Sequence, residues 1–250
     1  MPLSSPFRRA TLTSALAAVL TSPALATAAV DHTAFDALLK ATVSAEGWVD
    51  YPRLQKQTKK LKTYIAALGR VDPAQIDSNA ERIAFWLNAY NAVCLQTLID
   101  HGLPASVPKA TFFGKNIFTE TTYRIAGKIR YLDDIEHGIL RQQFKDNRIH
   151  AAVVCGAESC PRLRREAYTG ELLDKQFTEE VERWVRTGKD QSGQRKNYLD
   201  RTRNIFYVSK IFYWFQEDFG DSEAGVLDFL KGYVDPADAE HMKTHKMRIK

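Results

Sequence analysis

Apolar residues recur at helical spacing along several segments of the chain. In the longest of these, between residues 79 and 100, successive apolar side chains fall on one stripe at about 100° per residue. The stripe consists of Ile83, Leu87, Tyr90, Cys94 and Leu98. Residues 78–81, Ser-Asn-Ala-Glu, have the form of a capping box, and Gly102 followed by Pro104 can end a helix. The pattern predicts a long helix from about Asn79 to Asp100.

Shorter elements are predicted on both sides of this helix. Helical spacing also covers residues 35–43, 54–68, 133–141, 170–186, 211–220 and 222–232. Two short extended runs, 121–125 and 128–132, surround Ala126-Gly127 and predict a β-hairpin. Residues 204–208 predict one further strand. Helices therefore dominate the expected fold, and strands are few.

Residues 149–154 form a short apolar run, with His150 as its one polar residue. Such a run is typical of a strand that is covered on both faces, as in the middle of a sheet. The two-residue repeat of a strand would place His150 on the face opposite Cys155. The fold class predicted is α+β, a single helix-rich domain with a small mixed sheet whose central strand is about 149–154.

The N-terminal residues have the composition of an export signal. An arginine pair at residues 8–9 precedes an uncharged run, 10–26, rich in Ala, Leu, Thr and Ser. This run is too short and too polar for a permanent membrane anchor, and no later segment reaches the length that a span needs. We therefore predict a signal peptide at 1–26, no transmembrane anchor, and a periplasmic or secreted protein.

The length of the rest of the chain is typical of one domain, and its net positive charge is concentrated at the C-terminal end. Residues 29–241 suit one globular domain, and 242–250 form a basic tail that supplies four basic residues and no acid, read as a solvated end. The formal net charge of +5 therefore owes much to this tail, and nucleic-acid binding, which needs a basic folded face, is not expected. No phosphate-binding glycine loop and no zinc-ligand spacing occurs, so we expect neither a cofactor nor a metal.

Two cysteines, Cys155 and Cys160, stand five residues apart directly after the apolar run. In an exported protein they can form a disulfide that closes a short loop. Alternatively, Cys155 is a nucleophile, activated by the N-terminus of a helix that Pro161 would begin. A redox pair is less favoured because the spacing is not Cys-x-x-Cys. The first two interpretations are equally supported by the residues.

A nucleophilic Cys155 needs a base and groups that orient the base and stabilise an oxyanion. His137 is the candidate base, and Glu136, Asn88 and Asn91 are the candidate orienting or oxyanion-polarising residues. Each has a structural alternative. Glu136 can bond a helix cap, and the two asparagines, which face the apolar side of the long helix, can bond the backbone of a loop. Cys94 on the same helix is expected to be a packed, inert thiol.

Four ordered motifs resemble the family catalogued as domain of unknown function 547. They are residues 85–91, 132–141, 148–161, and 209–212 with 218–219, and they extend over about 135 residues. The resemblance implies that Cys155 is a regular family feature while the position of Cys160 can be serine. It favours a site built by Asn88, Asn91, Glu136 and Cys155, and it brings no established reaction.

The leading functional hypothesis is an exported thiol-dependent hydrolase or acyl transferase that uses Cys155. The competing hypothesis is a non-catalytic periplasmic binding or assembly module with a structural Cys155–Cys160 disulfide. The ligand would be a small molecule, a peptide or a glycan. Whether the chain is an enzyme stays open at the level of the sequence.

Overall fold

A central helix, α4 (Asn79–Asp100), organises the structure. The structure is a computed structural model that describes residues 30–103, 111–112, 115–156, 160–190 and 192–250. Its first turn is capped as predicted, because the Ser78 hydroxyl accepts a hydrogen bond of 3.0 Å from the Glu81 amide. Every residue from Ile83 to Leu98 is buried. A helix that is buried all round lies in the interior of a fold, and the predicted long helix is confirmed.

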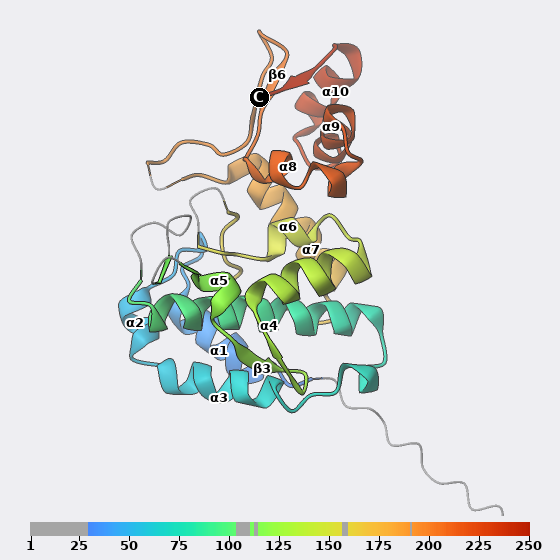
Figure 1. The fold of residues 1–250 in the computed structure, drawn as a ribbon. Coiled ribbons are helices and arrows are strands. Elements are labelled where there is room, and N and C mark those ends of the chain that lie inside the picture. Colours follow the sequence, from blue (N-terminus) through green and yellow to red (C-terminus); the bar gives the residue numbers. More distant parts are fainter. Residues whose placement is uncertain (1–29, 104–110, 113–114, 157–159, 191) are drawn as a thin grey trace, which may run out of the picture.

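Three N-terminal helices pack beside α4 in the lower part of the molecule (Figure 1). They are α1 (Thr33–Thr42), α2 (Tyr51–Gln55) and α3 (Thr58–Leu68). The single helix predicted over 54–68 is therefore interrupted before Thr58. A 3-10 turn, η1 (Pro73–Gln75), follows α3, and α5 (Ile117–Glu120) follows α4.

The strands form small, separate sheets. β1 (Thr111–Phe112) pairs with β2 (Lys115–Asn116), and the predicted hairpin is present as β3 (Tyr123–Ile125) and β4 (Lys128–Arg130). Its two turn residues, Ala126 and Gly127, have φ values of 52° and 73°, as a tight hairpin turn requires. The third sheet has the order β5 (Tyr198–Asp200), β6 (Ile205–Tyr207), β7 (Arg248–Ile249). Helices with small sheets confirm the α+β class.

The central strand predicted at 149–154 is wrong. Ile149–Ala152 form a short helix, α6, and only the residues from Val153 onward are extended. The turn begins at Asp146, whose carbonyl accepts from the Ile149 amide at 3.1 Å and whose carboxylate accepts from the Arg148 amide at 3.0 Å. The run is apolar on all sides because α6 is buried on all sides, and periodicity cannot separate a short buried helix from a buried strand.

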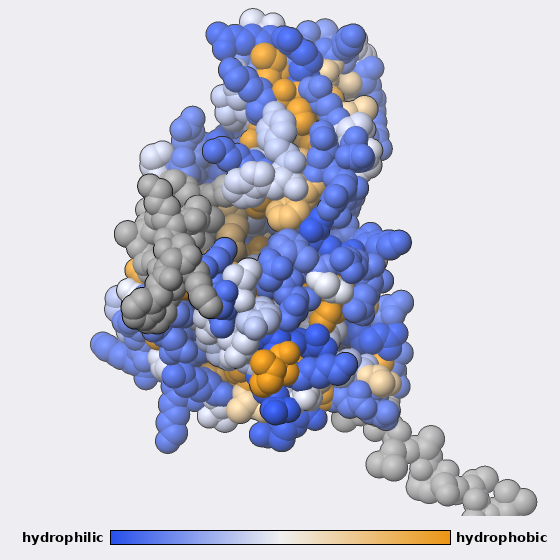
Figure 2. Space-filling view, viewed as in Figure 1, coloured by the Kyte–Doolittle hydropathy of each residue, from blue (hydrophilic) through white to orange (hydrophobic). Residues whose placement is uncertain are grey.

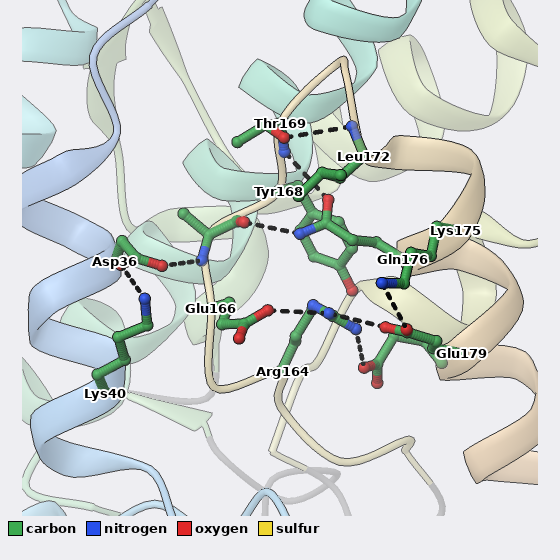
Figure 3. A network of polar contacts seen from close by, with 12 residues as sticks. Asp36, Lys40, Arg164, Glu166, Tyr168, Thr169, Leu172, Lys175, Gln176 and Glu179 are labelled. Carbon is green, nitrogen blue, oxygen red and sulfur yellow. Dashed lines mark hydrogen bonds and ion pairs between the residues drawn. The ribbon is translucent and has the colours of Figure 1, made fainter.

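No helix begins at Pro161, so the expected helix N-terminus beside Cys155 is absent from the described residues. After η3 (Asp134–Phe144), a π-helix, and α6, the next helix is α7 (Leu173–Glu182), which continues as the π-helical η4 (Arg183–Thr187). The irregular segment before α7 is held by side chains instead, as Figure 3 shows. The amide of Ala167 donates to Asp36 of α1 at 3.1 Å, and Gln176 of α7 donates to the Ala167 carbonyl at 2.9 Å.

The C-terminal part consists of short elements in the upper part of Figure 1. They are α8 (Ile211–Trp214), the 3-10 turn η5 (Gln216–Phe219), α9 (Glu223–Lys231) and α10 (Pro236–Thr244). The terminal segment 242–250 is not a solvated end. Met242 is buried, and β7 pairs in parallel with β6. Apolar residues between the basic ones, such as Ile249, give this segment an inner face that a count of its charges overlooks.

Two hydrophobic cores result. The first core gathers buried residues of α1, α3, α4 and η3, and the second core gathers those of η4, β6, α8 and α9. The continuous helix of α7 and η4 serves both, because Phe177 belongs to the first core and Val181 to the second. α6 does the same through Ala152 and Ala151. Within the residues that the structure describes, no helix combines the length and apolarity needed to cross a membrane.

Candidate functional site

A pocket of about 290 Å³ opens where the two cores meet. In Figure 2 the surface is hollowed between α5 and α8, and apolar residues in tan and orange line part of this hollow. The lining residues are Tyr90, Asn116, Phe118, Leu132, Asp133, Glu136, His137, His150, Val153, Cys155, Cys160, Ile211, Trp214 and Phe215. Three of the five predicted site residues, Cys155, His137 and Glu136, are thus brought together. Asn88 and Asn91 are not among the residues that line it.

Asn91 fixes the segment that carries Cys155. Its amide nitrogen donates to the Ala152 carbonyl at 2.9 Å, and its amide oxygen accepts from the Val154 amide at 3.0 Å. The side chain thereby takes the place of a neighbouring strand for the extended residues after α6. Asn91 is only 3% exposed, so these bonds satisfy backbone groups that water cannot reach.

Asn88 holds a second loop in the same way. It donates to the Tyr168 carbonyl at 2.8 Å and accepts from the Tyr168 amide at 2.9 Å. The loop-fixing alternative given above for the two asparagines is therefore what the structure shows. Their spacing of three residues on α4 makes them neighbours, and together they attach two distant segments to the central helix.

His150 and Asp218 form a hydrogen-bonded pair at the back of the pocket. The His150 Nε2 lies 2.6 Å from the Asp218 carboxylate, and the ring stacks on Phe215 with centroids 4.7 Å apart. Burial alone would raise the pKa of Asp218, but the hydrogen bonds from His150 and Arg141 outweigh it and lower the pKa to about 2. An ionised Asp218 can only accept a hydrogen bond, so the Nε2 of His150 carries a proton. In the neutral ring the other nitrogen, Nδ1, then carries none. No hydrogen bond to this Nδ1 occurs within the described ranges.

The predicted strand would place His150 on the face opposite Cys155. Because residues 149–152 are helical, that prediction is wrong. In α6 the ring is only 3% exposed, and His150 lines the same pocket as Cys155. One feature of the sequence could have indicated this pair, because both His150 and Asp218 stand in the motifs that resemble the family. Their separation of 68 residues leaves no local pattern that would pair them.

His137 is held in a different state. Its Nδ1 lies 2.9 Å from the guanidinium of Arg141, which can only donate, so Nδ1 accepts and carries no proton. The Nε2 proton then faces Asp133 at 3.4 Å. Both nitrogens of His137 are therefore engaged, and a neutral ring in this arrangement has no free lone pair for a substrate.

Arg141 connects the two histidines. It lies over the Phe215 ring, 4.5 Å from its centroid, and donates to Asp218 and to Glu217 at 2.5 Å each. Its own contact with His137 completes a chain of polar groups from η3 to η5. His137 lines both the pocket and a second, charged hollow of about 320 Å³, which Arg141, Glu217 and Asp218 also help to line.

Cys155 and Cys160 form a disulfide in the structure. Cys155 is half-buried, whereas Cys160 is buried and only 6% exposed, so Cys155 is the more accessible of the two cysteines. Cys94 is a buried free thiol whose pKa is raised by burial and by the charge of Glu136, in agreement with an inert role. In the parts of the chain that the structure covers, no group of three or more His, Cys, Asp or Glu side chains could hold a metal ion.

The family match agrees with these motifs. Residues 74–185 match the family described as protein of unknown function, DUF547. This segment includes both asparagines, η3, α6 and both pocket cysteines, whereas Asp218 follows it. No match was found among curated proteins or among solved structures.

Proposed function

We propose that the chain is an exported thiol-dependent hydrolase or acyl transferase in which reduced Cys155 is the nucleophile. The observation that carries this proposal is that Cys155 and His150 line one pocket, with ionised Asp218 hydrogen-bonded behind His150. A nucleophile, a base and a group that orients the base are the parts that acyl transfer through a thiol requires.

The tautomer of His150 sets the sequence of proton transfers. Nδ1 takes the proton of the Cys155 thiol while the sulfur attacks the carbonyl carbon of an acyl donor. The bond from that carbon to the leaving group then breaks, and the proton on Nδ1 goes to the departing group. The resulting thioester is cleaved by water or by a second acceptor, whose proton passes through Nδ1 and returns to the sulfur. Asp218 stabilises the imidazolium throughout.

The geometry favours His150 over His137 as the base, because the Nδ1 of His137 already accepts from Arg141. Asn88 and Asn91 are assigned to positioning, since each uses its amide oxygen and its nitrogen on backbone groups. Asn91 acts most directly, because it holds the residue immediately before Cys155.

A disulfide sulfur cannot attack a carbonyl, so the oxidised pair is an inactive form of the proposed enzyme. Reduction by a dithiol converts the Cys155–Cys160 bond into two thiols and the dithiol into its own disulfide. The exposure of Cys155 makes it the sulfur that an incoming thiolate reaches. We therefore expect activity to depend on a reductant.

Export is part of the proposal and is supported by residues 1–26 and by the disulfide. A disulfide is stable in the periplasm or outside the cell and rare in the cytosol. Residues 1–26 lie outside the described residues, so the signal peptide is indicated by their sequence alone. N-terminal sequencing of the protein recovered from the periplasm or the medium tests this location.

A non-catalytic binding or assembly module is the second candidate. The specific observation in its favour is that the disulfide is closed while both asparagines serve the backbone. In that case the pocket binds a ligand and Cys155 never reacts.

The C160S variant separates the two candidates, because it keeps Cys155 as a free thiol without any reductant. We expect p-nitrophenyl acetate to acylate Cys155 in a burst of one equivalent, visible as a thioester mass on its peptide. The C155S/C160S variant, whose one cysteine is the buried Cys94, is the matched control. In the C160S background, His150→Gln should slow acylation by about 10²–10³-fold.

The enzyme proposal is overturned if C160S acylates no faster than C155S/C160S, or if His150→Gln has no effect on the rate. Thermal unfolding of each variant shows that the compared proteins are folded. Wild-type protein with and without dithiothreitol then tests whether the disulfide controls the reaction.

A further inference from the structure

The pocket carries an excess of negative charge. Its ionisable lining residues are Asp133, Glu136, His137 and His150, and no lysine or arginine is among the described residues that line it. His137 accepts a hydrogen bond from Arg141 and His150 lies against Asp218, so each histidine is engaged by a charged group that does not line the pocket. Asp133 and Glu136 are the two carboxylates that a ligand in this pocket meets.

Glu136 is the carboxylate without a cationic partner. Asp133 faces His137, whereas none of the ion pairs among the described residues involves Glu136. Its neighbour is the buried Tyr90, whose pKa is raised well above its usual value by burial, by the charge of Glu136 and by a hydrogen bond with that carboxylate. The Tyr90 hydroxyl offsets part of the cost of placing a half-buried carboxylate beside apolar walls, and a positive group on a ligand would offset more of it.

The remaining walls are apolar and end in an exposed aromatic rim. Of the apolar lining residues, Leu132, Val153 and Ile211 are buried, and Phe118 and Phe215 are partly buried. Trp214 at the rim is 58% exposed, which is unusual for the largest apolar side chain. An exposed Trp beside a concave apolar surface offers a planar face to a ligand.

We propose that the pocket selects acyl donors that carry an ammonium group next to an apolar or aromatic side chain, as esters or amides of apolar amino acids with a free amino group do. The ammonium group lies at Glu136, the side chain lies against the apolar wall and Trp214, and the carbonyl lies toward Cys155. This assignment rests on the proposed function, because it takes the acyl group to be the reacting part.

Binding is measured on the C155S/C160S variant, which cannot turn over any acyl donor. The probes are L-phenylalanine amide, its N-acetyl derivative, and 3-phenylpropionate, compared by isothermal titration calorimetry in low salt. We expect the ammonium probe to bind about tenfold more tightly than the acetylated one, as a charge-assisted contact provides. The carboxylate probe should bind more weakly than either.

Substitutions in the same background assign the preference to residues. Glu136→Gln should reduce the ratio between the ammonium and acetylated probes to within about threefold, whereas Glu171→Gln, an exposed carboxylate on another surface, should leave it unchanged. Trp214→Ala should weaken both probes alike and preserve the ratio. Because the ratio compares two probes on one protein, a partly destabilised variant does not distort it.

The inference is overturned if the acetylated probe binds as tightly as the ammonium probe, if no probe binds, or if Glu136→Gln leaves the ratio unchanged. Failure of the proposed function gives a different pattern, namely a cation preference in binding together with a C160S protein that acylates nothing. Acylation of C160S without any preference overturns the inference alone.

Discussion

The first and second cores differ in how they are built. The first core surrounds one long helix, α4, whose buried asparagines attach two loops through four hydrogen bonds of 2.8–3.0 Å. The second core is assembled from short helices and a three-stranded sheet, and aromatic rings fill it. Trp184 stacks on Phe212 with centroids 4.7 Å apart, and Phe212 lies 4.9 Å from Phe219. Buried side-chain amides bonded to backbone groups order the first core, and packed aromatic rings order the second.

The pocket takes different parts from each core. The first core fixes the backbone before Cys155 through Asn91, and it supplies Glu136 through η3. The second core supplies Asp218, Trp214 and Phe215 on consecutive short elements. Neither core contains a complete site, so the proposed chemistry depends on how the two are joined through α6, α7 and the Arg141 contacts.

Removing the orienting carboxylate tests the contribution of the second core. In the C160S background, Asp218→Asn should reduce the acylation rate by about 10²-fold, no more than the loss of His150 itself, because the amide no longer fixes the His150 tautomer. Glu217→Gln is the matched control, since Glu217 also bonds Arg141 but does not contact His150. A rate in Asp218→Asn that equals the rate in Glu217→Gln would contradict the His150–Asp218 assignment. Burst kinetics measure both rates.

Removing an asparagine tests the first core. Asn91→Ala leaves the Ala152 carbonyl and the Val154 amide without partners in a buried site, and we expect a loss of about 4 kcal/mol in the free energy of unfolding. Asn116→Ala removes a hydrogen bond of 2.9 Å to the Phe118 amide at an exposed helix end and should cost about 1 kcal/mol. Urea unfolding measures both. Equal losses would show that Asn91 holds its segment no more firmly than a surface cap does.

The first core also carries a pH-sensitive group, His32. It is 6% exposed, its Nδ1 lies 2.6 Å from the Tyr64 hydroxyl, and burial outweighs the nearby Asp31 to lower its pKa to about 4. The unfolded chain therefore binds a proton near pH 6.5 that the folded chain refuses until about pH 4. Stability is fully present above pH 6.5 and is lost as the pH falls toward 4, by about 3 kcal/mol in total.

His32→Gln gives the difference curve that isolates this effect from other titrating groups. Urea unfolding at several pH values between 7 and 4 should show a steeper loss for the wild type than for the variant. Parallel curves would mean that His32 titrates alike in both states. Because His32 is far along the chain from the elements of the second core, the acylation rate of folded C160S protein should not follow this curve.

The sequence predicted the first core well because its signals are local. The stripe of α4, its Ser78 cap and the Gly102 stop all lie within one segment, and each acts on its immediate neighbours. The alternatives for Asn88 and Asn91 could also be stated correctly, since a polar residue on an apolar helix face needs a buried partner. Which backbone each asparagine meets could not be predicted, because the partners lie 80 and 61 residues away.

The part of the site that depends on the second core was not predictable in this way. A four-residue apolar helix such as α6 has no period that distinguishes it from a strand, and the wrong choice moved His150 to the wrong face. Asp218 belongs to a 3-10 turn whose position follows from ring packing, for which the sequence shows only a concentration of aromatic residues. Tertiary contacts, rather than local propensity, decide both.

Truncation of the last strand tests how the second core is closed. Deleting residues 247–250 removes the pairing of β7 with β6, including the bond of 2.9 Å from the Lys250 amide to the Phe206 carbonyl, and the contacts of Ile249 with the core. We expect a loss of about 1–2 kcal/mol, since an edge pair and one partly buried side chain contribute about that much. Lys246→Gln removes an exposed charge and keeps the strand, so it should leave the free energy of unfolding unchanged.

If both variants unfold like the wild type, the segment is a solvated end after all. If only the truncation destabilises, hydrogen exchange should rise at Phe206 and Val208 and stay unchanged along α4, because α4 belongs to the other core.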